Sequence, residues 1–148
     1  MDIPDDDASW SPMVPELACA DLAESLAFYT GHLGFGVRYE RSGFAYLEFS
    51  HAPEGRPVQL MLEQAGEHWS TGELERPFGR GINLQIETVG VEALHARLVD
   101  AGIALFRGLD LAWYRDGEIE HGVRQFLVQD PSGYLLRFME PVGTRAAA

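Results

Sequence analysis

Residues 130–140 read DPSGYLLRFME, a tight turn followed by an apolar run. Pro131 presets φ in the turn and Gly133 accepts the left-handed conformation that ends it, so a strand is predicted over residues 134–140. Side chains alternate along a strand, so Leu136 and Arg137 face opposite sides. An arginine has only hydrogen-bond donors and stays protonated, and the Arg137 position therefore cannot bind a metal ion.

The chain has 148 residues and a mass of 16.4 kDa, enough for one domain with its own core. Its single cysteine, Cys19, excludes an intramolecular disulfide and suits a reducing compartment. Residues 1–7 are acidic, unlike the basic start of a signal peptide, and no segment approaches the roughly 20 apolar residues of a membrane span. We therefore expect a cytoplasmic protein that does not bind membranes.

The chain is acidic, with 23 acidic residues against 11 basic ones and a formal net charge of −12. This charge would repel nucleic-acid phosphates and instead favours a cationic ligand. An equally good explanation is that the charge keeps the protein in solution. Part of it lies in two segments that we expect to be tails, a flexible acidic one at residues 1–11 and a C-terminal one at residues 142–148.

Residues 12–64 and 78–141 are each predicted to form a strand, a helix and three more strands. Asp21 is a suitable N-cap for the first helix, and Gly34 and Gly102 end the two helices. The same spacing separates Gly34 from Gly102 and Leu26 from Leu94, as expected of a duplicated unit. The strands of the first module are expected at residues 13–19, 35–40, 44–49 and 58–63, and those of the second at 82–87, 103–106, 125–129 and 134–140. The predicted fold class is α+β, with two tandem βαβββ modules that form curved mixed sheets within one domain.

One face of each sheet is covered by its helix, and the other, here called the open face, can enclose a ligand. Alternation places Phe44, Tyr46 and Glu48 on the open face of the first module. In residues 82–87 it directs Ile82, Leu84 and Ile86 toward the helix, and Asn83, Gln85 and Glu87 toward the open face. Polar and aromatic side chains at these positions favour a binding surface, although inward aromatic rings can also simply fill the concave space.

Several motifs recur in the order and spacing of a known fold: Val14-Pro15-Glu16-Leu17, Asp21-Leu22, Ser25-Leu26, Phe28-Tyr29, Leu33-Gly34-Phe35, Gly79-Arg80-Gly81-Ile82-Asn83 and the DPSGY turn. In these motifs the chain resembles the vicinal oxygen chelate superfamily, which includes glyoxalase I, extradiol dioxygenases and bleomycin resistance proteins. The resemblance covers nearly all of residues 13–140. In metal-dependent members, four strands supply His, Gln or Glu ligands.

The resemblance places those four ligand positions at Val14, at Leu60 or Met61, at Gly81 or Ile82, and at Arg137. None of these side chains suits a hard or borderline divalent ion, so we expect no metal and no other cofactor. A site built from His51, His68 and His121 is an alternative, although the histidines show no HxH or HxxxH spacing.

Among the superfamily's members, the chain looks most similar to the metal-free bleomycin resistance proteins, through Val14-Pro15, Leu33-Gly34-Phe35 and Leu136-Arg137-Phe138. This resemblance implies a homodimer with strands exchanged near Pro15, which sequesters a cationic, partly aromatic glycopeptide antibiotic between its subunits. The alternative is a glyoxalase- or dioxygenase-like enzyme, with Glu16, Glu48 or Glu63 as a general base. A third possibility, an assembly or transcription partner without a small ligand, predicts a groove filled by the protein's own side chains.

The candidate ligand-binding residues are aromatic, acidic or polar. Rings that can stack on a flat or cationic ligand are Phe44, Tyr46, Trp69, Trp113 and Tyr114. The last three lie in predicted loops, where they could instead pack within the module or against the dimer partner. Carboxylates that would attract a cation are Glu16, Glu48 and Glu63. Asn83 and Arg137 complete the set. For Arg137, an ion pair with one of these glutamates is favoured over ligand contact.

Overall fold

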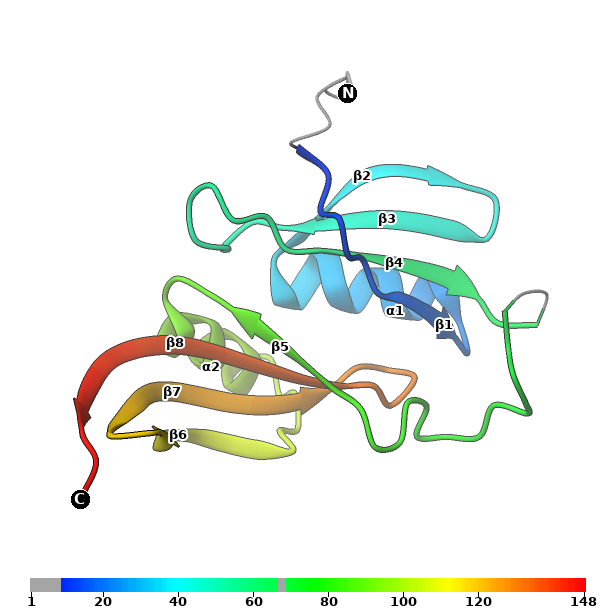
Figure 1. Cartoon of the computed structure of the whole chain (residues 1–148). Helices are drawn as coiled ribbons and strands as arrows, with labels where there is room; N and C mark the ends of the chain where they lie inside the picture. The colour runs from blue at the N-terminus through cyan, green and yellow to red at the C-terminus, as the bar shows by residue number, and fades with distance from the viewer. Residues whose placement is uncertain (1–8, 67–68) are drawn as a thin grey trace.

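The computed structural model describes residues 9–66 and 69–148. They form two four-stranded sheets, each with helical segments packed on one of its faces (Figure 1). The first module contains β1 (Glu16–Cys19), α1 (Leu22–Phe28), the π-helical turn η2 (Tyr29–Leu33), β2 (Phe35–Arg41), β3 (Phe44–Phe49) and β4 (Gln59–Gln64). The second contains β5 (Asn83–Glu87), α2 (Val91–Asp100), β6 (Arg107–Asp116), β7 (Ile119–Gln129) and β8 (Leu135–Ala146). The predicted α+β fold of two βαβββ modules is confirmed.

The two sheets have the same topology. The first sheet has the order β1-β4-β3-β2 and the second β5-β8-β7-β6. β1 pairs with β4 and β5 with β8 in parallel, whereas the remaining neighbours are antiparallel. In each module the first strand therefore lies at one edge, beside the last strand, because the helix carries the chain back across the sheet. No helix within residues 9–66 and 69–148 is long and apolar enough to cross a bilayer.

The first helical segment begins and ends where the sequence predicts. Asp21 is the N-cap of α1, and its Oδ1 accepts a hydrogen bond from the Glu24 backbone N–H at 3.3 Å. Gly34 ends η2 with a φ of 92°, a conformation that glycine adopts without steric cost. A Cβ atom at Gly34 would also lie 2.8 Å from the His51 ring. Both the turn and the close approach of His51 therefore require glycine here.

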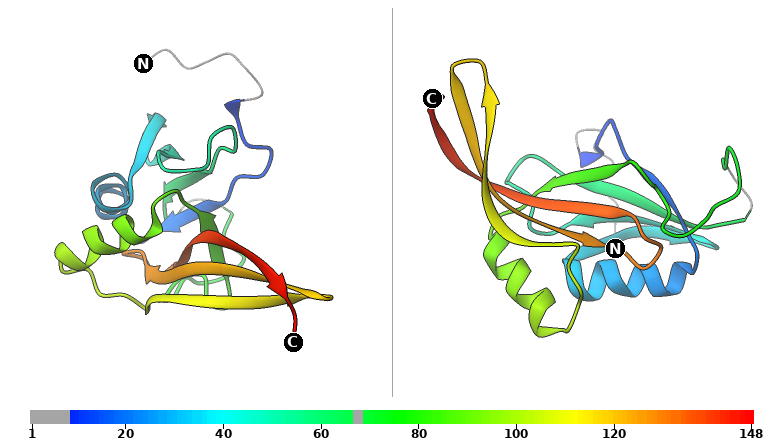
Figure 2. Two further views of the ribbon diagram at one scale, coloured as in Figure 1. Left: turned by 90° about the vertical axis from the view of Figure 1, so that its left-hand side faces the viewer. Right: turned by 90° about the horizontal axis from the view of Figure 1, so that it is seen from below.

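One hydrophobic core joins the two modules. It contains the helix-facing side chains of both sheets together with buried residues of α1, η2 and α2. The rings of Phe49 from β3 and Phe138 from β8 lie 5.7 Å apart, and Phe138 stacks on Phe126 from β7 at 5.5 Å. The modules thus pack through their helix-facing sides. The open faces turn away from the shared core (Figures 1 and 2).

The DPSGY turn folds around the buried Asp130 carboxylate. Oδ1 accepts hydrogen bonds from the backbone N–H groups of Ser132, Gly133 and Tyr134 at 2.9, 2.9 and 3.0 Å. Oδ2 accepts one at 2.7 Å from the hydroxyl of Tyr29 in η2, which belongs to the other module. Burial raises the pKa of Asp130 above its ordinary value, although these hydrogen bonds act in the opposite direction.

The same turn also contacts the first strand. The Tyr134 hydroxyl donates to the Ala18 carbonyl at 3.0 Å, and the Ser132 hydroxyl accepts from the Ala20 backbone N–H at 3.0 Å. Together with the Tyr29–Asp130 hydrogen bond, these contacts tie the second module to β1 and η2 of the first. The turn is therefore a polar connection between the modules as well as the start of β8.

Cys19 is fully buried at the end of β1. Burial raises the pKa of its thiol to about 11. Only a small fraction would be thiolate even at about pH 8, where free cysteine reacts readily. We expect no modification of the folded protein by a thiol reagent under these conditions, and complete modification once denaturant is added, as measured by mass spectrometry. Rapid labelling of the folded protein would contradict the burial of this strand.

Three expectations about the second module are wrong. Residues 103–106 are not a strand, because the Ile103 backbone N–H still bonds to the Leu98 carbonyl at the end of α2, and the strand is β6, from Arg107 to Asp116. Ile82 lies outside β5 and is 61% exposed. Residues 142–146, expected to belong to a tail, are the end of β8.

A long hairpin is the reason for the first and third of these corrections. β6 and β7 meet at Gly117, and with the end of β8 they form an arm that projects from the body (Figure 2). The apolar side chains of the arm do not alternate regularly with polar ones, because Leu111 to Tyr114 follow one another and His121 and Gly122 interrupt the start of β7. The sequence therefore lacks the pattern that indicates a half-buried strand. Trp113 and Tyr114 therefore lie on β6 rather than in a loop.

Candidate functional site

The open face of the first sheet carries the aromatic and acidic side chains that alternation predicts there. Ala45, Leu47 and Phe49 of β3 belong to the core, which places Phe44, Tyr46 and Glu48 on the opposite face. The register sets Tyr46 beside Tyr39 of β2 and Met61 of β4, Phe44 beside Arg41 and Glu63, and Glu48 beside Gln59. Phe44 and Tyr46 are only 5% and 6% exposed, so other groups cover them.

A β-bulge in β2 adds a cation to this face. The register between β2 and β3 shifts between Val37 and Tyr39, and Arg38 is the extra residue. The Arg38 side chain is 7% exposed, and Nη1 lies 3.6 Å from Glu48 Oε1. The bulge therefore brings a buried guanidinium group next to the open-face carboxylate.

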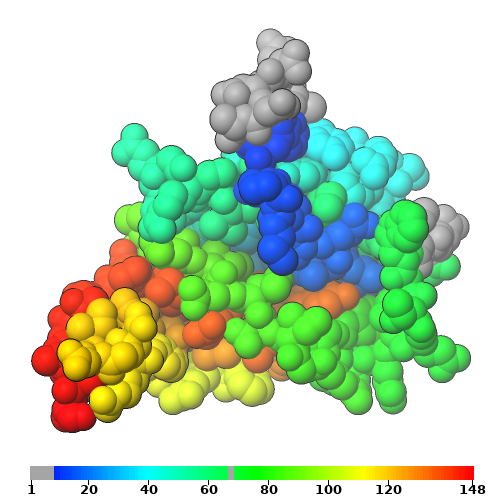
Figure 3. Space-filling view, in the orientation of Figure 1, coloured from blue at the N-terminus to red at the C-terminus, as the bar shows by residue number. Residues whose placement is uncertain are grey.

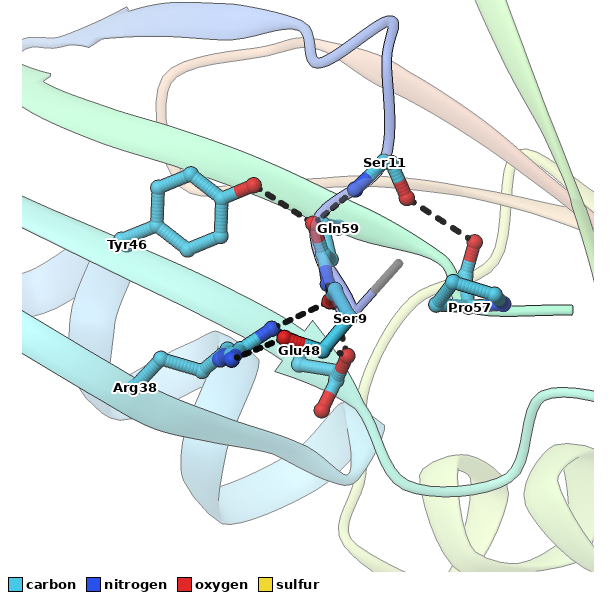
Figure 4. Close-up of polar contacts among 7 residues, drawn as sticks. All are labelled: Ser9, Ser11, Arg38, Tyr46, Glu48, Pro57 and Gln59. Carbon is cyan, nitrogen blue, oxygen red and sulfur yellow. Dashed lines mark hydrogen bonds and ion pairs between the residues drawn. The ribbon is translucent and has the colours of Figure 1, made fainter. Parts of the chain in front are cut away.

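Gln59 is the centre of a polar network on this face (Figure 4). Its Oε1 accepts a hydrogen bond from the Tyr46 hydroxyl at 2.5 Å, and its Nε2 donates to Glu48 Oε1 at 2.7 Å. Burial raises the pKa of Tyr46 above its ordinary value, an effect that the positive charge of Arg38 partly opposes. Tyr46 therefore remains a protonated donor at neutral pH.

Residues 9–11, here called the strap, lie across this network. The Trp10 ring makes edge-to-face contacts with Tyr46 at 5.0 Å and Tyr39 at 6.1 Å, and the Arg38 guanidinium carbon lies 3.7 Å from the Trp10 ring centroid. The first described residues, dark blue in Figure 3, run over the surface of the first sheet. The expectation of a flexible tail is therefore wrong for residues 9–11, and its residues 1–8 lie outside the described residues.

A cavity of about 640 Å³ adjoins the strap. Its walls include Ser9, the Arg38–Glu48 pair, and Glu54 and Arg56 of the β3–β4 connection. Arg56 is also paired with Glu87 at the end of β5. The strap thus covers Tyr46, and the cavity next to it stays open to a small molecule. Charged groups of either sign on that molecule could find an opposite charge among the arginines and glutamates of the cavity wall.

The other acidic candidates lie further along the same face. Glu16 is exposed on β1 and is paired in register with Met61, and Glu63 is half-buried on β4 opposite Phe44. The guanidinium carbon of Arg41 lies 3.7 Å from the centroid of the Phe44 ring. This second region therefore combines an aromatic ring, a stacked cation and two carboxylates.

The remaining candidates lie away from the strap network. Trp69 is 88% exposed in the connection between β4 and β5. The Arg145 guanidinium lies 4.1 Å above the Trp113 ring, and a Cβ at Gly122 would lie 2.7 Å from that ring, so Trp113 packs within the arm, as the alternative interpretation holds. The Tyr114 hydroxyl accepts a hydrogen bond from Gln125 Nε2 at 2.6 Å.

On the second sheet, the Arg137 side chain donates from Nε to Asn83 Oδ1 at 3.1 Å. Among the residues that the structure describes, Arg137 forms no ion pair with a glutamate. The expected pairing with Glu16, Glu48 or Glu63 is therefore wrong, because Asn83 on the adjacent parallel strand lies within reach of the guanidinium group. An amide oxygen satisfies one donor without neutralising the charge.

Sequence reasoning missed Trp10, Arg38, Tyr39 and Gln59. Alternation along residues 58–63 would have found Gln59, which shares a face with Met61 and Glu63. Arg38 carries no such signal, because the bulge shifts it out of the alternating pattern. Trp10 is preceded by an acidic run that favours an unstructured end, and only the tertiary structure shows its contacts.

The model of the Glyoxalase/Bleomycin resistance protein/Dioxygenase superfamily matches residues 13–138. The chain belongs to this superfamily. A superfamily member from Vibrio splendidus 12B01 is 35% identical, over 87% of this chain and 97% of that one, with a TM-score of 0.41. TioX from Micromonospora sp. ML1 is 21% identical, over 93% and 98%, with a TM-score of 0.62. No curated protein matches significantly.

A second superfamily member with a similar fold comes from Alicyclobacillus acidocaldarius. It is 24% identical, over 88% of this chain and 92% of that one, with a TM-score of 0.56. At this level of identity, as for TioX, the similarity concerns the fold. The arrangement of two βαβββ modules is thus shared, and the activity has to be argued from the site.

The superfamily's four metal-ligand positions do not fit a divalent ion here. Val14 and Ile82 lie just outside β1 and β5, Met61 offers a soft thioether on the open face, and Arg137 is a cation. No cluster of three or more His, Cys, Asp or Glu side chains suited to a metal occurs in residues 9–66 and 69–148. His68 lies outside the described residues, and His121 contacts Asp116 at 2.9 Å instead.

Proposed function

We propose that this protein binds and sequesters a cationic, partly aromatic small molecule, such as a bleomycin-type glycopeptide, without a metal ion and without transforming it. The observation that carries the proposal is the chemistry of the open face of the first sheet. Aromatic rings and carboxylates gather there, while the superfamily's ligand positions hold side chains that do not suit a divalent ion. Such a face can recognise a ligand but offers no Lewis acid to activate it.

The preference for a cation is supported by the contacts that the rings already make. The guanidinium groups of Arg38 and Arg41 each lie 3.7 Å from a ring centroid, that of Trp10 and that of Phe44 respectively. Ring faces of the strap and of this sheet thus already accommodate positive charge through their quadrupoles. Glu63, opposite Phe44, adds a negative charge, and the formal net charge of −12 would steer a cation toward the surface.

The proposal includes a homodimer. The two modules of one chain share a core on their helix-facing sides, and the cavity between residues 57–60 and 83–86, about 290 Å³, is smaller than the one beside the strap. The second module therefore does not close the open face of the first sheet. In a dimer whose subunits exchange strands at Pro15, just before β1, the second copy would cover the open face of the first sheet from the other side. Closed twofold assemblies of this kind are the commonest soluble oligomers. The open face would then become a binding groove between two subunits.

Calorimetric titration with a bleomycin-type glycopeptide tests the proposal. We expect saturable heat and recovery of chemically unchanged ligand, and no stoichiometric metal in the purified protein. Glu63→Gln should weaken binding about fivefold to tenfold, because it removes a carboxylate beside the aromatic face. The matched control is Glu24→Gln, on the exposed start of α1, which should bind like the unchanged protein.

Three outcomes would contradict this function. Tightly bound stoichiometric metal would show a ligand set that the open face does not predict. Conversion of the ligand would show an enzyme. Equal weakening in the Glu63 and Glu24 variants would show that total charge, rather than the groove, controls affinity.

A further inference from the structure

The Gln59 side chain holds the strap through hydrogen bonds to the strap's backbone. Gln59 Oε1 accepts a hydrogen bond from the Ser11 backbone N–H at 2.8 Å, and Gln59 Nε2 donates to the Ser9 carbonyl at 2.7 Å (Figure 4). These two peptide groups flank Trp10. The side-chain amide thus pairs with the chain on both sides of the indole, much as a neighbouring strand pairs with a peptide.

The ring between these peptide groups occupies its own subsite. Tyr46 and Tyr39 contact the Trp10 ring edge-to-face, and the Arg38 guanidinium lies over it. Arg38 also donates to the Ser9 carbonyl and, at 3.1 Å, to the Ser9 hydroxyl. Aromatic pairs and a desolvated cation–π contact each contribute favourably beyond area burial. The subsite therefore has the chemistry to select a planar ring carried between two amide groups.

The strap can leave without breaking the sheet. Residues 9–11 lie outside β1 and the other strands, and these hydrogen bonds go to the Gln59 and Arg38 side chains and, from Ser11 Oγ at 3.2 Å, to the Pro57 carbonyl. The cavity of about 640 Å³ is lined by Ser9, Arg38 and Glu48 and so is continuous with the subsite. A ligand in the cavity would directly contact the strap.

We propose that the strap occupies a ligand subsite, and that this subsite takes an aromatic group flanked by amides, as in an extended peptide or a peptide-like molecule. The ligand's ring replaces Trp10 against Tyr39, Tyr46 and Arg38, and its amides replace the strap backbone at Gln59. The inference deepens the proposed function and rests on it only in placing the ligand on the first sheet. Because the strap competes with the ligand, the apparent affinity falls in proportion to the fraction of molecules with an open subsite.

N-acetyltryptophanamide tests the subsite, because it is an indole between two amides and carries no charge. We expect Trp10→Ala to bind it about tenfold more tightly than the unchanged protein, since the competing ring is gone. Trp69→Ala is the matched control. It also removes one tryptophan, from a position that is 88% exposed, and should bind like the unchanged protein. Binding is followed by NMR, with the Gln59 side-chain amide as the reporter.

Ser11→Pro provides a second variant that keeps Trp10 and the whole groove. Proline lacks the backbone N–H that reaches Gln59, so the strap is held less tightly and the affinity for N-acetyltryptophanamide should rise by a smaller factor. This variant decides the question if Trp10→Ala does not fold. The inference is overturned if neither strap variant binds more tightly than Trp69→Ala, or if the Gln59 signal does not respond.

The two proposals fail separately. The strap variants could bind N-acetyltryptophanamide more tightly while calorimetric titration with the glycopeptide gives no heat. This result would support the subsite and contradict the proposal of a cationic ligand. The opposite result is heat on titration with the glycopeptide, together with unchanged affinities of the strap variants for both the glycopeptide and N-acetyltryptophanamide. It would support the proposed function and contradict the subsite.

Discussion

Asp130→Ala is expected to lower the free energy of unfolding by about 3–5 kcal/mol. Asp130 is 4% exposed, and its carboxylate accepts hydrogen bonds from three backbone N–H groups and from the Tyr29 hydroxyl. Alanine leaves all four donors without this acceptor, and the Tyr29 hydroxyl and the Ser132 N–H among them are buried. The loss also loosens the connection between the two modules, because Tyr29 belongs to the first and Asp130 to the second.

Urea unfolding followed by circular dichroism measures this loss. Asp130→Asn keeps an acceptor oxygen for the turn and should lose less, about 1–2 kcal/mol. The control is Asp21→Ala, which removes the exposed N-cap of α1 and should cost about 1 kcal/mol. If Asp130→Ala were no more harmful than Asp21→Ala, the turn would not be a connection between modules.

The pH dependence of the same comparison has a definite sign. Burial raises the pKa of Asp130, so its protonated form is favoured by folding. Its contribution to stability is complete below the ordinary aspartate pKa of about 3.9 and is lost as the pH rises through the raised value. The advantage of the unchanged protein over Asp130→Asn should therefore shrink from acid toward neutral pH. An advantage that grows over this range would show that the hydrogen bonds outweigh burial.

Arg38→Ala is expected to cost about 2–4 kcal/mol of unfolding free energy. Its guanidinium group is buried, pairs with Glu48 at 3.6 Å, donates to Ser9 and stacks on Trp10. Without it, the Ser9 carbonyl loses a donor and the Glu48 carboxylate loses its counter-ion. The change should also release the strap, which would appear as a shift of the Trp10 indole N–H signal toward its position in an unfolded chain.

Arg41→Ala is a closely matched control. Both arginines lie 3.7 Å from a ring centroid, on the same strand and the same face, but Arg41 is exposed. Exposed cation–π contacts contribute about 0.5–1 kcal/mol, so Arg41→Ala should cost less than about 1 kcal/mol and leave the strap signal unchanged. Equal losses from the two variants would mean that ring stacking, rather than buried polar contacts, holds the strap.

Local signals predicted much of the first module. The Asp21 cap, the Gly34 turn and the strict alternation of residues 44–49 are each specified by neighbours in sequence, and each was confirmed. Alternation also places Phe44, Tyr46 and Glu48 on the open face. The same reasoning did not predict the arm, because its apolar side chains, such as the consecutive Leu111 to Tyr114, do not alternate with polar ones. Sequence patterns therefore predict a loop at Trp113, which lies on β6.

The sequence by itself determined the duplicated α+β architecture, the core-facing side of β3, and the side chains at the superfamily's metal positions. All three depend on residue type and local spacing. The contacts of the strap, the bulged Arg38 and the Asn83 partner of Arg137 were decided only by tertiary structure. The physical reason is that these contacts join residues far apart in the chain, through a bulge or a short segment whose position no periodic pattern encodes.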